Sequence, residues 1–155
     1  MLGDWRPACS VEHLRLRAQV LADIRKFFSE RSVLEVETPL LSQGIGTDPQ
    51  LAFFTTEYSL VPQKQTLFLQ TSPEFAMKRL LAAGSGSIYQ IAKAFRNGES
   101  GRFHNPEFTM LEWYHVGFKL AELMDECADL IARLFDHRKP LMETERFTYQ
   151  AIFQR

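Results

Sequence analysis

The sequence has 155 residues, 45% of them hydrophobic, and its 18 Lys and Arg nearly balance its 19 Asp and Glu, so the formal net charge is −1 at pH 7. This length predicts one domain or part of a larger one, with enough apolar residues for a packed core. The balanced charge excludes a global positive field that would attract nucleic acid or anionic membranes. No apolar stretch approaches the ~18 residues of a membrane span, and Cys9 and Cys127 match no metal or redox spacing. We therefore expect a cytoplasmic protein with reduced thiols.

The N-terminal part of the chain predicts a long helix followed by a short strand. Ser10 can cap a helix that runs to about Arg31, because apolar side chains recur along one face of it. Residues 32–41 (SVLEVETPLL) are rich in β-branched side chains and predict a strand that ends at the proline. Residues 42–65 are expected to be irregular, with one short hairpin around residues 51–61.

The next segment predicts a strand that is followed directly by a helix, with no loop between them. Residues 66–71 (TLFLQT) predict a buried strand that leads directly into the helix SPEFAMKRLLAAG. Ser72 suits the cap of this helix, Pro73 its first position and Gly84 its end. Glu74 then lies in the first turn beyond a strand end, where it either serves a function or only complements the helix dipole.

Two alternating segments, SIYQIAKAFRN and EFTMLEWYHV, predict strands joined by a loop of about ten residues. If they form an antiparallel hairpin, Arg96 and Phe108 face the same cavity near its mouth. Glu112 and Tyr114 then lie deeper on the same face. Such a loop is longer than hairpin closure needs, and loops of this kind often bind ligands.

The C-terminal segment predicts two further elements. Residues 119–135 carry an apolar stripe at helical spacing and predict a helix that packs against the core. Residues 145–155 predict another strand or turn, with Thr148 as its cap.

The predicted hairpin face combines groups that suit two different ligands. Arg96 offers a planar fork of donors for a phosphate, and Phe108 can stack on a base. Glu74 and Glu112 suit a cationic amino group, and Tyr114 adds a hydroxyl. These residues favour a site for a nucleotide and an ammonium-bearing substrate; the alternative is a structural hairpin with solvated charges. The sequence has no Walker-type glycine loop, dinucleotide fingerprint or metal-ligand spacing, so no metal ligand is assigned.

Three segments resemble the class II aminoacyl-tRNA synthetases, and specifically their lysyl branch. FRNGESGRFHNPEFTMLEWY resembles motif 2 of that family, VLEVETPLL after its helix resembles motif 1, and TSPEFAMKRLLAAG resembles the lysine-pocket segment. Motif 1 would cover about residues 14–41 and motif 2 about residues 88–115. Within the branch, these details and the pair Thr47 and Asp48 are most similar to the short elongation factor P lysine ligases.

The resemblance implies an α+β fold with a mixed, mainly antiparallel sheet flanked by helices. Residues 1–155 would be the N-terminal portion of the catalytic domain, since motif 3 is absent. No anticodon-binding domain is expected, because only about ten residues precede the first helix. The first helix and the strand after it would form a homodimer interface.

The resemblance also implies a reaction. Enzymes of this family use ATP and Mg²⁺ to adenylate lysine or (R)-β-lysine and transfer it to a lysine of elongation factor P; tRNA and membranes are not expected as partners. Arg96 would be the catalytic residue, holding the α-phosphate. The implied ATP-binding residues are Arg96, Asn97, Gly98, Glu99, His104, Asn105 and Phe108. The implied residues of the substrate-amine pocket are Ser72, Pro73, Glu74, Glu112 and Tyr114.

The sequence departs from the family pattern at two points. Gly98 stands where the family has a glutamate that reads the adenine amino group, which puts adenine recognition in question. Without motif 3 and the later acidic residues, which would hold most of the Mg²⁺, we expect this chain alone to be inactive. Two alternatives stay open: a lysyl-tRNA synthetase core that charges tRNA, and a non-enzymatic paralogue that serves in nucleotide binding or dimerisation.

Overall fold

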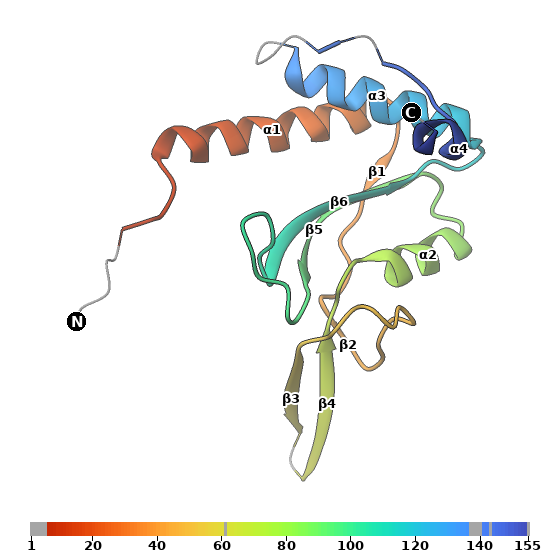
Figure 1. Ribbon diagram of the computed structural model, residues 1–155. Coiled ribbons are helices and arrows are strands. Elements are labelled where there is room, and N and C mark those ends of the chain that lie inside the picture. The colour runs from red at the N-terminus through yellow and green to blue at the C-terminus, as the bar shows by residue number, and fades with distance from the viewer. Residues whose placement is uncertain (1–5, 61, 137–140, 143, 155) are drawn as a thin grey trace. The chain divides into compact units, whose positions relative to one another are not determined.

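The computed structural model describes residues 6–60, 62–136, 141–142 and 144–154. The chain divides into two compact units: a sheet unit of residues 28–116, and a helical unit of residues 1–27 and 117–155. The content of helices and mainly antiparallel strands confirms the predicted α+β class. In chain order the elements labelled in Figure 1 are α1 (Val11–Ser29), β1 (Leu34–Glu35), β2 (Leu41–Ser42), β3 (Thr55–Leu60), β4 (Gln63–Leu69), α2 (Glu74–Ala82), β5 (Ile88–Phe95), β6 (Glu107–Tyr114), α3 (Leu120–Phe135) and α4 (Tyr149–Phe153).

The helical unit contains most of α1 together with α3 and α4. Ser10 caps α1 as predicted, since its Oγ accepts a hydrogen bond from the backbone N–H of His13 at 3.3 Å. The guanidinium of Arg133 lies 6.0 Å from the ring centroid of the buried Phe27, which joins α3 to α1 within this unit. None of the helices in the described ranges has the length and apolarity that crossing a membrane requires.

Two predictions for the helical unit need correction. Residues 149–153 form the short helix α4 where a strand or turn was predicted, although Thr148 caps it with a 3.1 Å bond from the backbone N–H of Ala151. α3 buries Leu130 but leaves Leu120 and Ile131 at least half exposed, so it buries only part of the predicted apolar stripe.

Both cysteines are free, as predicted. Cys9 is exposed, and burial raises the pKa of the Cys127 thiol, with the nearby Glu126 as a second cause. A raised pKa keeps a thiol protonated and unreactive, so Cys127 acts as a packing residue.

The first sheet of the sheet unit has the strand order β1-β5-β6. β5 and β6 pair antiparallel over their full length, from Ile88 with Tyr114 to Phe95 with Glu107, which confirms the predicted hairpin. β1 pairs parallel with β5 and is only two residues long. The predicted strand that ends at Pro39 is confirmed only in part: β1 lies before the proline but has two residues, and the residues after the proline begin the separate strand β2.

A small core holds the sheet unit together. Phe28 is fully buried and stacks on Tyr89 at a centroid distance of 4.5 Å, with the Trp113 ring 5.6 Å away. Met77 of α2 and Ile88 of β5 are also fully buried. These contacts fix the end of β5 from which the site described below extends.

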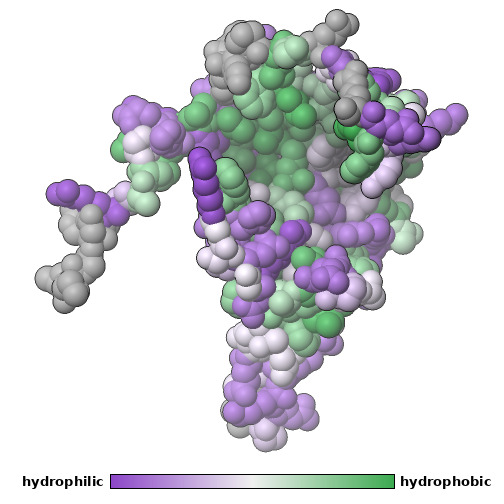
Figure 2. All heavy atoms as spheres, viewed as in Figure 1, coloured by the Kyte–Doolittle hydropathy of each residue, from purple (hydrophilic) through white to green (hydrophobic). Residues whose placement is uncertain are grey.

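The second sheet has the order β2-β4-β3, and β3 and β4 form a hairpin. Figure 2 shows that its lower end is mainly hydrophilic, and residues 63–66 are exposed. The hairpin was predicted within residues 51–61 but extends to Leu69, so its predicted bounds are wrong. Residues 66–69 do form a strand, the end of β4, but none of them is buried as was predicted.

Gln70 connects the second sheet to the first and so positions α2. Its N–H donates to the Leu40 carbonyl at 2.9 Å, its carbonyl accepts from the Phe95 N–H at 2.9 Å, and its side-chain amide donates to the Lys93 carbonyl at 2.8 Å. α2 then begins at Glu74, with Pro73 as its N-cap rather than its first residue. Gly84 follows the helix with a φ of +86°, as expected for a glycine that ends it.

Thr38 and Gln90 form a buried hydrogen bond that should contribute measurably to stability. The Thr38 hydroxyl donates to Gln90 Oε1 at 2.9 Å, and both residues are under 9% exposed. Thr38→Val removes the donor and strands the buried acceptor, so we expect a loss of about 1–3 kcal/mol in the free energy of unfolding. Urea denaturation would measure it. The control Thr56→Val, on the exposed β3, should change stability by less than about 0.5 kcal/mol, and equal losses would contradict the assignment.

Candidate active site

The floor of the candidate site is one face of the β5–β6 hairpin. The register pairs Gln90 with Glu112 and Ala94 with Phe108, and residues that are directly opposite share a face. The predicted placement of Phe108 and Glu112 on one face, four residues apart, is therefore confirmed. At about 3.3 Å per residue, roughly 13 Å of strand separates the two positions.

The end of the hairpin next to the loop presents a cation and an aromatic ring. Arg96 follows β5, and its guanidinium carbon lies 5.1 Å from the Phe108 ring centroid, so both residues face the same side as predicted. Arg96 Nη1 is 3.6 Å from Glu99 Oε1. Among the residues that the structure describes, Arg96 Nε is buried without a hydrogen-bond partner. A buried unpaired donor is costly, so this atom indicates where an anion would be stabilised.

The loop between the strands explains how Glu99 reaches Arg96. Gly98 has a φ of +81°, a conformation that side chains with a β-carbon rarely adopt. The turn there brings Glu99, three residues after Arg96, back toward the guanidinium. His104 pairs its backbone with Gly101. Asn97, Gly98, His104 and Asn105 are exposed on this loop, so their roles in nucleotide binding remain predictions.

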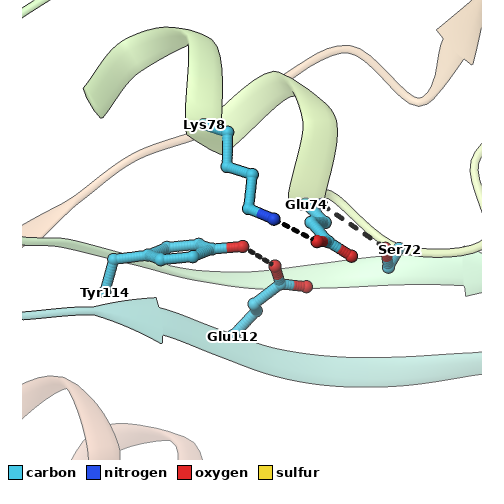
Figure 3. Close-up of polar contacts among 5 residues, drawn as sticks. All are labelled: Ser72, Glu74, Lys78, Glu112 and Tyr114. Atoms are coloured by element: carbon cyan, nitrogen blue, oxygen red, sulfur yellow. Dashed lines mark hydrogen bonds and ion pairs between the residues drawn. The ribbon is translucent and has the colours of Figure 1, made fainter. Parts of the chain in front are cut away.

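The other end of the face presents two carboxylates (Figure 3). The Tyr114 hydroxyl donates to Glu112 Oε1 at 2.6 Å. The Glu74 carboxylate, from the first turn of α2, points toward the same region, and Lys78 Nζ lies 2.5 Å from its Oε1. Ser72 Oγ accepts a weak bond from the backbone N–H of Glu74 at 3.4 Å. The buried Pro73 between them fixes the start of the helix, so the five predicted pocket residues lie on β6 and on the entry to α2.

The surroundings of Glu112 change its pKa. Burial raises the pKa of Glu112; the hydrogen bond from Tyr114 opposes this rise, the negative charge of Glu74 adds to it and the positive charge of Lys78 opposes it. Burial also raises the pKa of the Tyr114 hydroxyl far above its ordinary value, together with its bond to Glu112. Tyr114 is therefore a neutral donor at physiological pH, and an added ammonium would favour the charged form of Glu112.

The sequence analysis missed Lys78 as a member of this cluster. Its signal was the spacing of four residues from Glu74, which brings two side chains together on a helix surface. No group of three or more His, Cys, Asp or Glu in the described part of the chain could hold a metal ion.

The hairpin, the paired carboxylates beside it and the sequence together define a class of protein. A family model described as "tRNA synthetases class II (D, K and N)" matches residues 3–155, and the chain belongs to this family. The matched range includes both units and every predicted site residue.

The curated relatives that the chain matches carry the name of a particular enzyme rather than of a family. The "Elongation factor P--(R)-beta-lysine ligase" of Vibrio vulnificus (strain YJ016) is 55% identical over 155 residues, which is 99% of this chain and 47% of the relative. The ligase of the same name from Haemophilus influenzae (strain PittGG) is 50% identical over 156 residues, with 99% and 47% covered. That of Vibrio cholerae serotype O1 is 53% identical over 153 residues, with 97% and 46% covered. The chain spans about half the length of these relatives.

Proposed function

We propose that the complete protein adenylates lysine or (R)-β-lysine with ATP and transfers the aminoacyl group to a lysine of elongation factor P. The observation that carries the proposal is that Arg96, whose buried Nε has no hydrogen-bond partner, lies beside an aromatic ring on the same hairpin face as Glu112, while α2 adds the carboxylate of Glu74. The roughly 13 Å between Phe108 and Glu112 suits an extended aminoacyl nucleotide better than a free amino acid. The names of the relatives support this substrate and this acceptor.

The residues at the loop end fit a nucleotide. ATP would supply the activating AMP group, and the guanidinium of Arg96 would hold the α-phosphate and offset the charge that develops there. Phe108 would stack on the adenine, on the ring face that Arg96 leaves free or after that guanidinium has moved. Mg²⁺ is expected to accompany ATP, but the described residues contain no ligand cluster for it, and we assign it no ligand here.

The residues at the other end fit the side-chain amine. Glu74 and Glu112 would accept hydrogen bonds from the ammonium group, and Tyr114 would hold Glu112 in place. Catalysis of this kind depends on positioning and charge stabilisation. We further propose that the complete protein is a cytoplasmic homodimer. Residues 1–155 would form the N-terminal portion of its catalytic domain. We expect no turnover from the 155-residue chain by itself.

The intact mass of elongation factor P tests the proposed reaction. The protein from the complete reading frame would be incubated with ATP, (R)-β-lysine and elongation factor P, with reactions lacking ATP as the control. A parallel reaction would contain lysine and tRNA in place of (R)-β-lysine and elongation factor P. We expect one aminoacyl group to be added. Charging of tRNA with no change in elongation factor P would favour the lysyl-tRNA synthetase alternative, and absence of both products would favour the non-enzymatic one.

Glu99 gives a test of the nucleotide end. Its carboxylate pairs with Arg96 and so competes with a phosphate for the same cation. Glu99→Gln should lower the KM for ATP by about twofold to fivefold, because partly exposed ion pairs contribute about 0.2–1 kcal/mol. Pyrophosphate exchange at varied ATP would measure this change. A higher KM for ATP would contradict the competition and indicate that Glu99 contacts the nucleotide, in place of the glutamate that Gly98 replaces.

A further inference from the structure

Lys78 lies among the residues proposed to bind the substrate amine, but the proposed function gives it no role. Its ammonium lies 2.5 Å from Glu74 Oε1, one helical turn along α2. The two side chains are 55% and 43% exposed, and an exposed pair of this kind contributes little to the stability of a helix. An effect on the site is therefore a better account of the residue than an effect on the fold alone.

The charges of the cluster show what Lys78 changes. Glu74 and Glu112 contribute two negative charges, Lys78 contributes one positive charge, and the Tyr114 hydroxyl is neutral. Figure 3 shows the Lys78 side chain extending from α2 to the carboxylate of Glu74, with the carboxylate of Glu112 nearby. The charges of both Lys78 and Glu74 act on Glu112, which places all three within electrostatic reach.

We propose that Lys78 is a positioning residue of the amine pocket: it holds Glu74 and offsets one of the two carboxylates, so that the pocket presents one net negative charge to a substrate ammonium. This inference rests on the proposed function, because it assumes that the pocket binds an amine. Without Lys78 the two carboxylates would repel each other without compensation.

Removal of the Lys78 charge should change the affinity for lysine in opposite directions at acid and at alkaline pH. Lys78 opposes the rise in the pKa of Glu112, so its removal leaves Glu112 protonated up to a higher pH. A protonated carboxyl binds an ammonium poorly, so affinity for lysine falls on the acid side. On the alkaline side both carboxylates are charged and uncompensated, so affinity is kept or increased.

The test is the KM for lysine in pyrophosphate exchange by the complete protein, measured from about pH 5.5 to about pH 8. Lys78→Met removes the charge, and Lys78→Arg keeps it. Lys93→Met is the matched control, because Lys93 pairs with Glu107 at 2.9 Å, is 50% exposed and lies on the opposite face of the hairpin. For Lys78→Met we expect the KM to rise at least about threefold at the acid end and to stay equal or fall at the alkaline end. Lys78→Arg should restore most of the wild-type profile.

The outcomes distinguish a positioning role of Lys78 in the pocket from a role as a helix-surface ion pair only. A crossing of the wild-type and Lys78→Met profiles, absent from Lys93→Met, supports the inference. A uniform change at all pH values, or the same behaviour in both lysine variants, overturns it and leaves Lys78 as a helix-surface pair. If the wild-type protein itself shows no lysine-dependent exchange, the proposed function fails and the inference fails with it.

Discussion

Replacing Arg96 with alanine should lower the rate of lysine-dependent pyrophosphate exchange by about a hundredfold to a thousandfold in the complete protein. The guanidinium would be the group that faces the charge developing on the α-phosphate. Its Nε is already buried without a partner, so that charge-assisted bonds to a phosphate are formed at little reorganisation cost. We expect the loss mainly in kcat, because the interaction strengthens as charge develops.

Two further variants make this prediction specific. Arg102 lies on the same loop, with its guanidinium carbon 5.0 Å from the ring of the exposed Phe103, so Arg102→Ala removes an equal charge outside the site. We expect that control to stay within about twofold of wild type. Arg96→Lys keeps the charge without the planar fork and should recover only part of the rate. Near-normal exchange by Arg96→Ala would contradict the assignment of the nucleotide end.

Replacing Glu112 with glutamine should raise the KM for lysine by about thirtyfold or more, since truncating one partner of a buried charged pair costs about 2–5 kcal/mol. The change keeps the shape of the side chain and the contact with Tyr114 but removes the negative charge. The kcat at saturating lysine should fall much less. Glu107→Gln is the control, because Glu107 lies on the same strand but pairs with Lys93 on the opposite face.

The Glu112→Gln substitution should weaken lysine binding without destabilising the folded protein. The pKa of Glu112 is higher in the folded protein than its ordinary value, so its favourable contribution is present below the ordinary pKa. That contribution is lost as pH rises through the folded pKa. At neutral pH the ionised carboxylate therefore lowers the free energy of unfolding of the protein without substrate. The Glu112→Gln variant should melt at the same temperature as wild type or at a higher one. A lower melting temperature together with an unchanged KM would contradict both roles.

Both ends of the site pair their charges internally when no ligand is present. Glu99 lies beside Arg96, and Lys78 lies beside Glu74. Isolated charges in a partly buried site are expensive, and internal partners reduce that cost. A phosphate would displace Glu99 from Arg96, whereas Lys78 would stay with Glu74 while a substrate ammonium binds the carboxylates. Glu99 and Lys78 are internal partners, so substituting them should have modest effects. Arg96 and Glu112 would contact the ligands themselves, so substituting them should have large effects.

Alternation of side chains was enough to predict which residues share a face of the hairpin. The period of two in each strand placed Arg96 with Phe108 and Glu112 with Tyr114, and the register bears this out. The pattern worked because one buried face fixes strand register. The β3–β4 hairpin was predicted poorly for the converse reason: it buries few side chains, so its residues carry no burial pattern.

Lys78 was not assigned to the site from the sequence, and Glu99 was assigned only through the family resemblance. Both have flexible side chains whose direction depends on neighbours from other elements. The path of Glu99 depends on the positive φ of Gly98, which the sequence permits but does not dictate. The contact of Lys78 needs α2 to begin at Glu74, a start set by the connection through Gln70 and Pro73.

The most direct test of the central claim compares lysine with norleucine, which has the same side chain without the ammonium group, in pyrophosphate exchange by the complete protein. We predict exchange with lysine and (R)-β-lysine and a loss of about a hundredfold or more in kcat/KM with norleucine, because Glu74 and Glu112 would be left without their cation. Equal exchange with norleucine and lysine, or no exchange with any of the three, would contradict the account.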